Sequence, residues 1–339
     1  MNPIFAARAA LAAIAFLLIG AGAVFAQAPE ASPASPASAA SAPVACPAPA
    51  AIPTPEQVQA GMRDAIDHGF LWRIRKNGRT SYLYGTVHVA QAAWMYPGPS
   101  VLRALRASDT LALELDPLNP DIQRRMARGM AAKAGMVLPE PLAKRLRVQM
   151  QALCVPPEAL ASMGPEMQVA TLSILAARAD GLDPSYGIDV FLAGMGHGAK
   201  KSVLSLETPE LQLQALQMPD DAGTIAFVES GLVELESGQA RPMLLRLAKL
   251  WADADHAQLA RYEEWCDCLK TEFDRDAMRR LLDDRNPGLA ASIDALHASG
   301  KHVFAAVGSL HMFGATGLPT LMAQRGYQVE RVAYHGSAP

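Results

Sequence analysis

The stretch YLYGTVHVA at residues 82–90 runs from apolar residues to a glycine and, three positions later, to His88. The segment VFAAVGSLHM at residues 303–312 repeats this order and reaches His311. Glycine permits positive φ and close backbone approach, so it suits a strand that must turn abruptly. Open α/β sheets form their ligand crevices at the carboxyl ends of strands. We therefore expect both histidines to lie in one crevice.

The GxxH spacing alone is a weak signal. With 25 Gly and 8 His in 339 residues, roughly 25×8/339 ≈ 0.6 such pairs arise by chance, the usual risk with a short motif. A third match, Gly194 to His197, follows no strand-like run, and we expect a solvated helix end there. The other two share an apolar run and a small hydroxyl residue, Thr86 or Ser309, directly after the glycine. A lone histidine is most often a hydrogen-bonded core residue, but this matched pair favours a functional role.

The N-terminus is typical of a secretory signal peptide. Arg8 supplies a positive start, residues 9–19 form a short apolar run, and Val24-Phe25-Ala26 resembles a cleavage site. We predict a signal peptide at 1–26 and an exported protein, periplasmic or secreted, with an uncleaved anchor as the alternative. Residues 27–55 are dominated by Ala, Pro and Ser and are predicted to form a flexible tether.

The remaining chain, residues 56–335, is predicted to form a single domain with a helical insertion at about 118–180. The net charge of −3 does not indicate the basic surface that binds nucleic acid, so we expect no nucleic-acid partner. No later segment is long and apolar enough for a membrane span, so we expect none in the mature chain. The oligomeric state stays open.

Strand-like runs cluster near both ends of this domain, with one more in its middle. The Asn77-Gly78 pair between two apolar runs is a strong hairpin signal. The near-continuous apolar run at 110–115 is typical of a buried parallel strand. We therefore predict a mixed α/β (α+β) fold, in which a central mixed sheet is built from distant segments around a large, mostly helical middle region.

The four cysteines are Cys46, Cys154, Cys266 and Cys268. An even number in an exported protein favours disulfides. Cys266 and Cys268 are too close in sequence for an easy mutual bond, so one scheme pairs each of them with Cys46 or Cys154. A soft metal site at residues 266–268 is the competing interpretation.

Two carboxylates share the placement of the two histidines. Glu114 and Glu207 each end an apolar run, where an unpaired charge is costly to bury. Two imidazoles and two carboxylates at one sheet edge would form a nitrogen and oxygen ligand set suited to Zn, Mn, Co or Fe. The same groups also support acid–base chemistry without metal.

Each of these polar residues also has a structural interpretation. Glu114 can end a strand in solvent, and Glu207 can favour the positive end of the next helix. Asn286 and Asp189 are each placed to cap a following helix.

The ordered set of motifs resembles the TraB/GumN family, which is related to the Tiki proteases and more distantly to ChaN-like and erythromycin-esterase-like proteins. The resemblance covers about Phe70 to Val332, with Leu310 where the family often has a second glycine. The residues that carry it are Tyr82 to His88, Leu111 to Glu114, Gly187 to Asp189, Val203 to Thr208, Gln212, Arg285-Asn286, Ala306 to Gly314, Gly317-Leu318 and Gly326-Tyr327.

This resemblance implies a mixed α/β fold with paired GxxH motifs at one site. It implies a metal-dependent hydrolase acting on peptides or secreted proteins, with a divalent ion (Mn, Co or Zn). The predicted metal ligands are His88, Glu114, Glu207 and His311. The predicted catalytic residues are Glu114, Glu207, Arg285 and Asn286, with Arg285 expected to hold the developing oxyanion. The alternatives are a non-catalytic protein that binds metal, haem or peptide, and a metal-free esterase-like hydrolase.

Overall fold

The computed structural model describes residues 46–266 and 269–334. Six strands form one sheet in the order β4-β3-β5-β2-β1-β6. The pairs β2–β5, β5–β3 and β3–β4 are parallel, while β1 is antiparallel to both β2 and β6. The strands are β1 Phe70–Lys76, β2 Arg79–Thr86, β3 Thr110–Leu113, β4 Ser202–Ser205, β5 Val303–Gly308 and β6 Gln328–Arg331.

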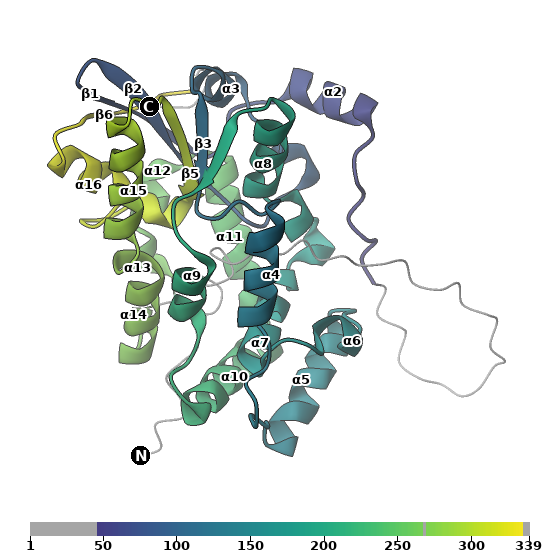
Figure 1. Ribbon diagram of the computed structural model, residues 1–339. Coiled ribbons are helices and arrows are strands. Elements are labelled where there is room, and N and C mark those ends of the chain that lie inside the picture. Colours follow the sequence, from purple (N-terminus) through teal and green to yellow (C-terminus); the bar gives the residue numbers. More distant parts are fainter. Residues whose placement is uncertain (1–45, 267–268, 335–339) are drawn as a thin grey trace.

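Helices surround the sheet and extend away from it. Figure 1 shows the sheet at one end of the molecule and α5, α6, α7 and α10 at the other. The α-helices are α2 Pro55–Asp64, α3 Pro99–Arg106, α4 Pro120–Gly129, α5 Glu140–Ala152, α6 Pro157–Leu160, α7 Pro165–Leu175, α8 Ile188–Gly198, α9 Pro209–Leu216, α10 Asp221–Glu236, α11 Ala240–Ala252, α12 His256–Leu259, α13 Tyr262–Trp265, α14 Glu272–Met278, α15 Asn286–Ala298 and α16 Leu318–Gln324. A π-helix, Arg279–Asp283, joins α14 to the segment before α15.

The predicted hairpin forms at Asn77 and Gly78. Both residues have positive φ, 52° and 71°, as a two-residue turn that matches strand twist requires. The register pairs Lys76 with Arg79 and continues to Phe70 opposite Gly85. Glycine and asparagine at this turn therefore fix which face of each strand enters the core.

The central strand β5 comes from the end of the chain and lies between two earlier ones. Ala306 pairs with Tyr84 of β2 on one side and with Leu113 of β3 on the other. Leu113 in turn pairs with Ser205 of β4. Four parallel strands therefore end at the same edge. This sheet of distant segments, with helix as the larger component, confirms the predicted mixed α/β fold.

The stretch from α4 to α7 consists mainly of helices joined by short connections. Asn119 caps the start of α4 by accepting a hydrogen bond from the Asp121 amide, and each of the four helices has a proline in its first turn. Residues 46–54 form no helix or strand before α2 begins. The predicted signal peptide lies outside the described residues.

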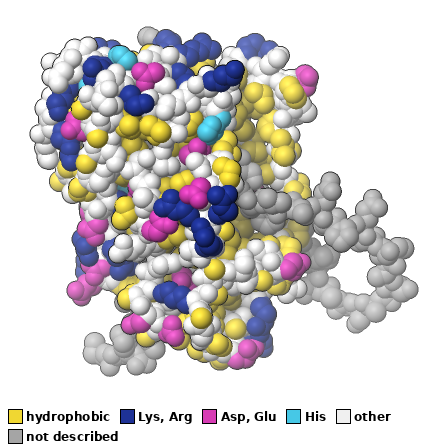
Figure 2. Space-filling model, viewed as in Figure 1, with side chains coloured by type: hydrophobic (Ala, Val, Ile, Leu, Met, Phe, Trp, Pro, Cys, Tyr) yellow, Lys and Arg dark blue, Asp and Glu magenta, His cyan; other side chains and the backbone are white. Residues whose placement is uncertain are grey.

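The visible surface carries charges of both signs. Figure 2 shows Lys and Arg side chains interspersed with Asp and Glu side chains on this face. Among the described residues, the helices are all too short or too polar to cross a membrane.

Cys46 and Cys154 form a disulfide with Cα atoms 5.7 Å apart. The scheme that pairs each of them with Cys266 or Cys268 is therefore wrong. The helix α5 ends at Ala152, and the positive φ of Cys154, 56°, turns the chain towards the segment before α2. Cys266 is also disulfide-bonded, which removes the thiolate that a metal site there would use. Cys268 lies outside the described residues.

The Cys46–Cys154 bond closes a long loop, with a sequence separation of 108. Replacing both cysteines by serine should lower the free energy of unfolding by about 2–4 kcal/mol, because the unfolded chain regains loop entropy. Urea denaturation of the unreduced proteins measures the difference. Unchanged stability, or the absence of a peptide linked through these cysteines in non-reducing peptide mapping, would contradict the assignment.

Candidate functional site

The predicted site residues lie together at the carboxyl edge of the parallel strands. Glu114 follows β3, and its Oε1 accepts a hydrogen bond of 2.7 Å from the Gly308 amide at the end of β5. His88 follows β2, and its Nε2 lies 3.9 Å from the same carboxylate. Six ionisable side chains form this buried charge cluster: His88, Glu114, Asp189, Glu207, Arg285 and His311.

The Arg285 guanidinium lies at the centre of the cluster. Its Nη2 donates to Glu114 Oε2 and to Glu207 Oε1, each at 2.5 Å, and its Nε donates to Glu207 Oε2 at 3.1 Å. Gln212 donates to both carboxylates at 3.2 Å. All of these side chains are buried or nearly so. One cation therefore holds together the ends of β3 and β4.

The remaining Arg285 nitrogen reaches His311. Nη1 donates to the Leu281 carbonyl at 2.9 Å and lies 3.3 Å from Nε2 of His311. The Nδ1–H of His311 donates to Oδ1 of Asn286 at 2.5 Å. Nε2 is therefore an acceptor for Arg285. Because every Arg285 nitrogen already has a partner, the predicted oxyanion role of this arginine does not match its contacts.

A π-helix directly precedes Arg285. Such turns insert one extra residue into a helix and are frequent at functional sites. Here the segment Arg279–Asp283 is followed by Arg285, which bonds back to the carbonyl of Leu281. The extra residue sets the direction in which Arg285 leaves the helix, towards the sheet edge rather than solvent.

Asp189 belongs to the site, although its position in the sequence indicated a helix cap. The α8 N-terminus has no side-chain cap. Instead, Oδ2 of Asp189 lies 2.6 Å from Nδ1 of His88, and Oδ1 accepts from the Thr86 hydroxyl at 2.8 Å. The Nδ1 edge of the His88 ring therefore faces the Asp189 carboxylate, and its Nε2 edge faces Glu114.

The two GxxH motifs pack against each other. A Cβ at Gly85 would meet Ser309 Oγ at 2.9 Å, and the Ser309 hydroxyl donates to the Thr86 carbonyl at 2.9 Å. Neither Gly85 nor Gly308 has positive φ. Gly85 therefore allows close approach rather than a left-handed turn.

The third GxxH match has a different role. A Cβ at Gly196 would meet Leu111 and Val203 at 2.8 Å, so this glycine lets α8 pack closely on β3 and β4. His197 lies outside the charge cluster, with Nε2 2.9 Å from Oδ2 of Asp116.

The contacts of these polar residues differ from the strand-end and helix-end roles that the sequence also allowed. Glu114 is only 3% exposed rather than ending a strand in solvent. The cap of α9 is Thr208, which accepts from the Leu211 amide, so Glu207 is left to pair with Arg285. Asn286 holds His311 and caps no helix through its side chain.

The surroundings within the cluster shift the pKa values of its members in different directions. Burial opposes ionisation of Glu114, but the charge of Arg285, aided by the hydrogen bond from the Gly308 amide, lowers its pKa below the usual value. Burial raises the pKa of Glu207 despite Arg285. Burial and Arg285 lower the pKa of His311 to about 3, so this ring is neutral. Burial opposes protonation of His88, yet Asp189 and Glu114 raise its pKa.

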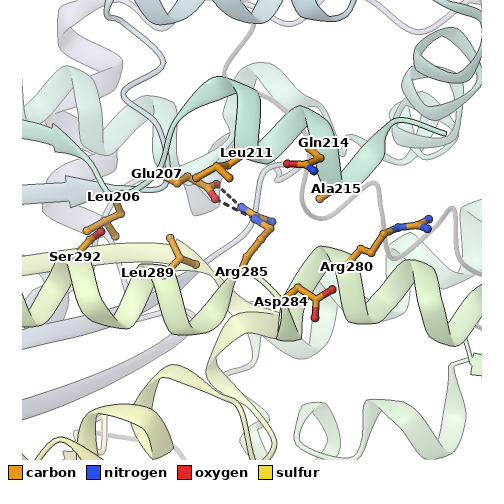
Figure 3. A pocket seen from close by; sticks show the side chains of 11 residues that line it. Leu206, Glu207, Leu211, Gln214, Ala215, Arg280, Asp284, Arg285, Leu289 and Ser292 are labelled. Carbon is orange, nitrogen blue, oxygen red and sulfur yellow. Dashed lines mark hydrogen bonds and ion pairs between the residues drawn. The ribbon is translucent and has the colours of Figure 1, made fainter. Parts of the chain in front are cut away.

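A pocket of about 450 Å³ adjoins the cluster between α9 and the helical segment around Arg285. Figure 3 shows that Glu207 and Arg285 face each other in its middle. His88, Glu114 and His311 do not line this pocket.

The predicted metal ligands fit one ion only in part. His88 Nε2 has no hydrogen-bond partner among the described residues, and its 3.9 Å separation from Glu114 Oε1 allows both atoms to bind one ion. Glu207 and His311 instead direct their acceptor atoms at Arg285. In the described part of the chain, no three His, Cys, Asp or Glu side chains are placed around one metal position.

The fold and the site define a mixed α/β protein whose paired GxxH motifs meet at the carboxyl edge of a sheet. A sequence model of the TraB/PrgY/gumN family matches residues 70–331, and the chain belongs to this family. No curated protein and no solved structure gives a significant match.

The central ion pairs make Arg285 a strong test of the arrangement. Arg285→Met should lower the free energy of unfolding by about 3–5 kcal/mol, because it leaves two buried carboxylates without their cation. Chemical denaturation measures the loss. Arg124→Met, which removes an exposed ion pair with Asp121, should cost at most about 1 kcal/mol. Equal effects of the two substitutions would contradict the central role of Arg285.

His311 should make the fold sensitive to acid. Its pKa is about 3 when folded against an ordinary value of 6.5, so below pH 6.5 the unfolded chain binds a proton that the folded chain does not. Stability is therefore lost as the pH falls from 6.5 towards 3. The stability advantage of the wild type over His311→Asn should shrink by on the order of 2 kcal/mol between pH 7 and pH 5. Denaturation curves at several pH values test this, and a constant difference would contradict a neutral His311.

Proposed function

We propose that the chain is an exported, metal-assisted hydrolase of peptide bonds, with its reaction centre beside His88 and Glu114. The observation that carries the proposal is the buried Nε2 of His88, which has no hydrogen-bond partner among the described residues and lies 3.9 Å from Glu114 Oε1. Asp189 holds the other ring nitrogen. A carboxylate that orients a histidine in this way is the usual neighbour of a metal-ligating imidazole.

The charge of the cluster supports a bound cation. Glu114, Glu207 and Asp189 carry three negative charges when ionised, and Arg285 supplies one positive charge. With His311 neutral, the cluster keeps two negative charges in excess unless His88 is protonated. Burying unbalanced charge is costly, so a divalent cation would stabilise the site. Nitrogen and oxygen donors suit Mn, Co or Zn.

The chemistry divides between the ion and the surrounding side chains. When bound by His88 and Glu114, the ion would polarise a substrate carbonyl and make water more acidic. Glu207 accepts a proton from the attacking water as the new carbon–oxygen bond forms. It returns that proton to the leaving amine as the carbon–nitrogen bond breaks. Its raised pKa and its position in the pocket support this role.

The remaining residues position these groups. Asp189 keeps the His88 lone pair directed at the reaction centre. Arg285 Nη2 and Gln212 Nε2 each donate to both Glu114 and Glu207 and so hold the two carboxylates beside each other. Export and peptide substrates are supported by the N-terminal sequence, by the disulfide and by the family resemblance.

Purified mature protein should cleave unstructured peptides in a mass-spectrometric assay, lose this activity on chelation and regain it with Mn, Co or Zn ions. Glu207→Gln should lower kcat by roughly 10²–10⁴-fold while metal stays bound, because only proton transfer is lost. His88→Gln should lower metal content as well as activity. Activity should also fall on acidification, because a protonated His88 cannot bind metal.

His197→Gln is the matched control, since it changes the GxxH histidine outside the cluster and should leave turnover unchanged. Activity that survives exhaustive metal removal would replace this proposal with a metal-free hydrolase. Ligand binding without turnover of any peptide or ester would favour a binding protein instead.

A further inference from the structure

The pocket beside the charge cluster has two different ends. Figure 3 shows the Glu207–Arg285 pair in its middle, Leu206 and Leu289 towards one end, and Arg280 with Asp284 towards the other. Its volume of about 450 Å³ falls in the range of small-ligand sites.

The apolar part of the pocket is available to a ligand. Leu211 lines it and is 54% exposed, although large hydrophobic side chains favour burial. Leu206, in the loop after β4, and Leu289, in α15, complete this apolar wall. An aliphatic side chain bound here would remove exposed apolar area from water, which favours binding.

Of the charged side chains that line the pocket, one cation has no ion pair among the described residues. Glu207 and Arg285 pair with each other, and Asp284 pairs with Arg279 at 2.7 Å. Arg280 is this cation. Its Nε and Nη2 are buried and have no hydrogen-bond partner among the described residues. Buried guanidinium donors without an acceptor are costly, and a bidentate carboxylate is the group that fits them best.

We propose that this pocket is a substrate subsite for an aliphatic residue that carries a carboxylate, and that Arg280 binds the carboxylate. The inference rests on the proposed hydrolase function and specifies its substrate. A C-terminal residue such as leucine matches the Arg280 end of the pocket, with its carboxylate at this arginine and its side chain against Ala215 and Leu211 of α9. An internal acidic side chain offers the same carboxylate chemistry from a second source.

Binding of small probes to the full mature protein, measured by titration calorimetry in the presence of chelator, tests the subsite without turnover. N-acetyl-leucine should bind at least about tenfold more tightly than N-acetyl-leucinamide, because the amide cannot form the charge-assisted contact. Arg280→Gln should abolish this preference, and Arg280→Lys should retain part of it. Arg124→Gln, an exposed arginine outside the pocket, should bind both probes as the wild type does.

The aspartate probe N-acetyl-aspartate N-methylamide distinguishes the two sources of the carboxylate. Weaker binding than N-acetyl-leucine supports the C-terminal carboxylate, and equal or tighter binding supports an acidic side chain at the same arginine. Equal binding of N-acetyl-leucine and its amide, or an unchanged preference in a folded Arg280→Gln protein, overturns the subsite. If the carboxylate preference holds while no peptide is cleaved, the hydrolase proposal fails and the subsite stands.

Discussion

The site depends on one buried cation shared by two carboxylates. Arg285 comes from a helical segment late in the chain, while Glu114 and Glu207 end strands encoded much earlier. Without the guanidinium, these carboxylates would repel each other in a medium that screens charge poorly. With it, their remaining lone pairs face defined directions: Glu114 towards His88 and Glu207 towards the pocket. In the proposed function, Arg285 thus separates one carboxylate for cation binding from one for proton transfer.

The fold and much of the site could be predicted because strand ends are visible in the sequence. An apolar run interrupted by a polar residue marks the point where a buried strand leaves the sheet. This rule placed His88, Glu114, Glu207 and His311 at one edge without any knowledge of strand order. The strand order then required long-range pairing of β5 between β3 and β2, which the parallel pattern alone does not specify.

The contacts among the site residues could not be predicted in the same way. Asp189 follows a glycine at a helix start, where capping explains an aspartate fully, and its contact with His88 depends on how α8 packs. The pairing of Cys46 with Cys154 depends on the turn after α5. Arg280 lies within the π-helix, which no sequence pattern indicated. Sequence spacing shows which residues end an element, but not which side chain faces another across a hundred residues or more.

The position of β5 also bears on how the protein acquires its structure. This strand, near residue 305, separates the β1–β2 hairpin from the β3–β4 pair. During synthesis, the first three hundred residues can form local helices and two incomplete sheet fragments, but the edge that carries the charge cluster is complete only after β5 inserts. Pairings between such distant segments carry a high loop-closure cost and fold slowly. A chain truncated before β5 would consequently have neither a continuous sheet nor a site, and its exposed strand edges would favour aggregation.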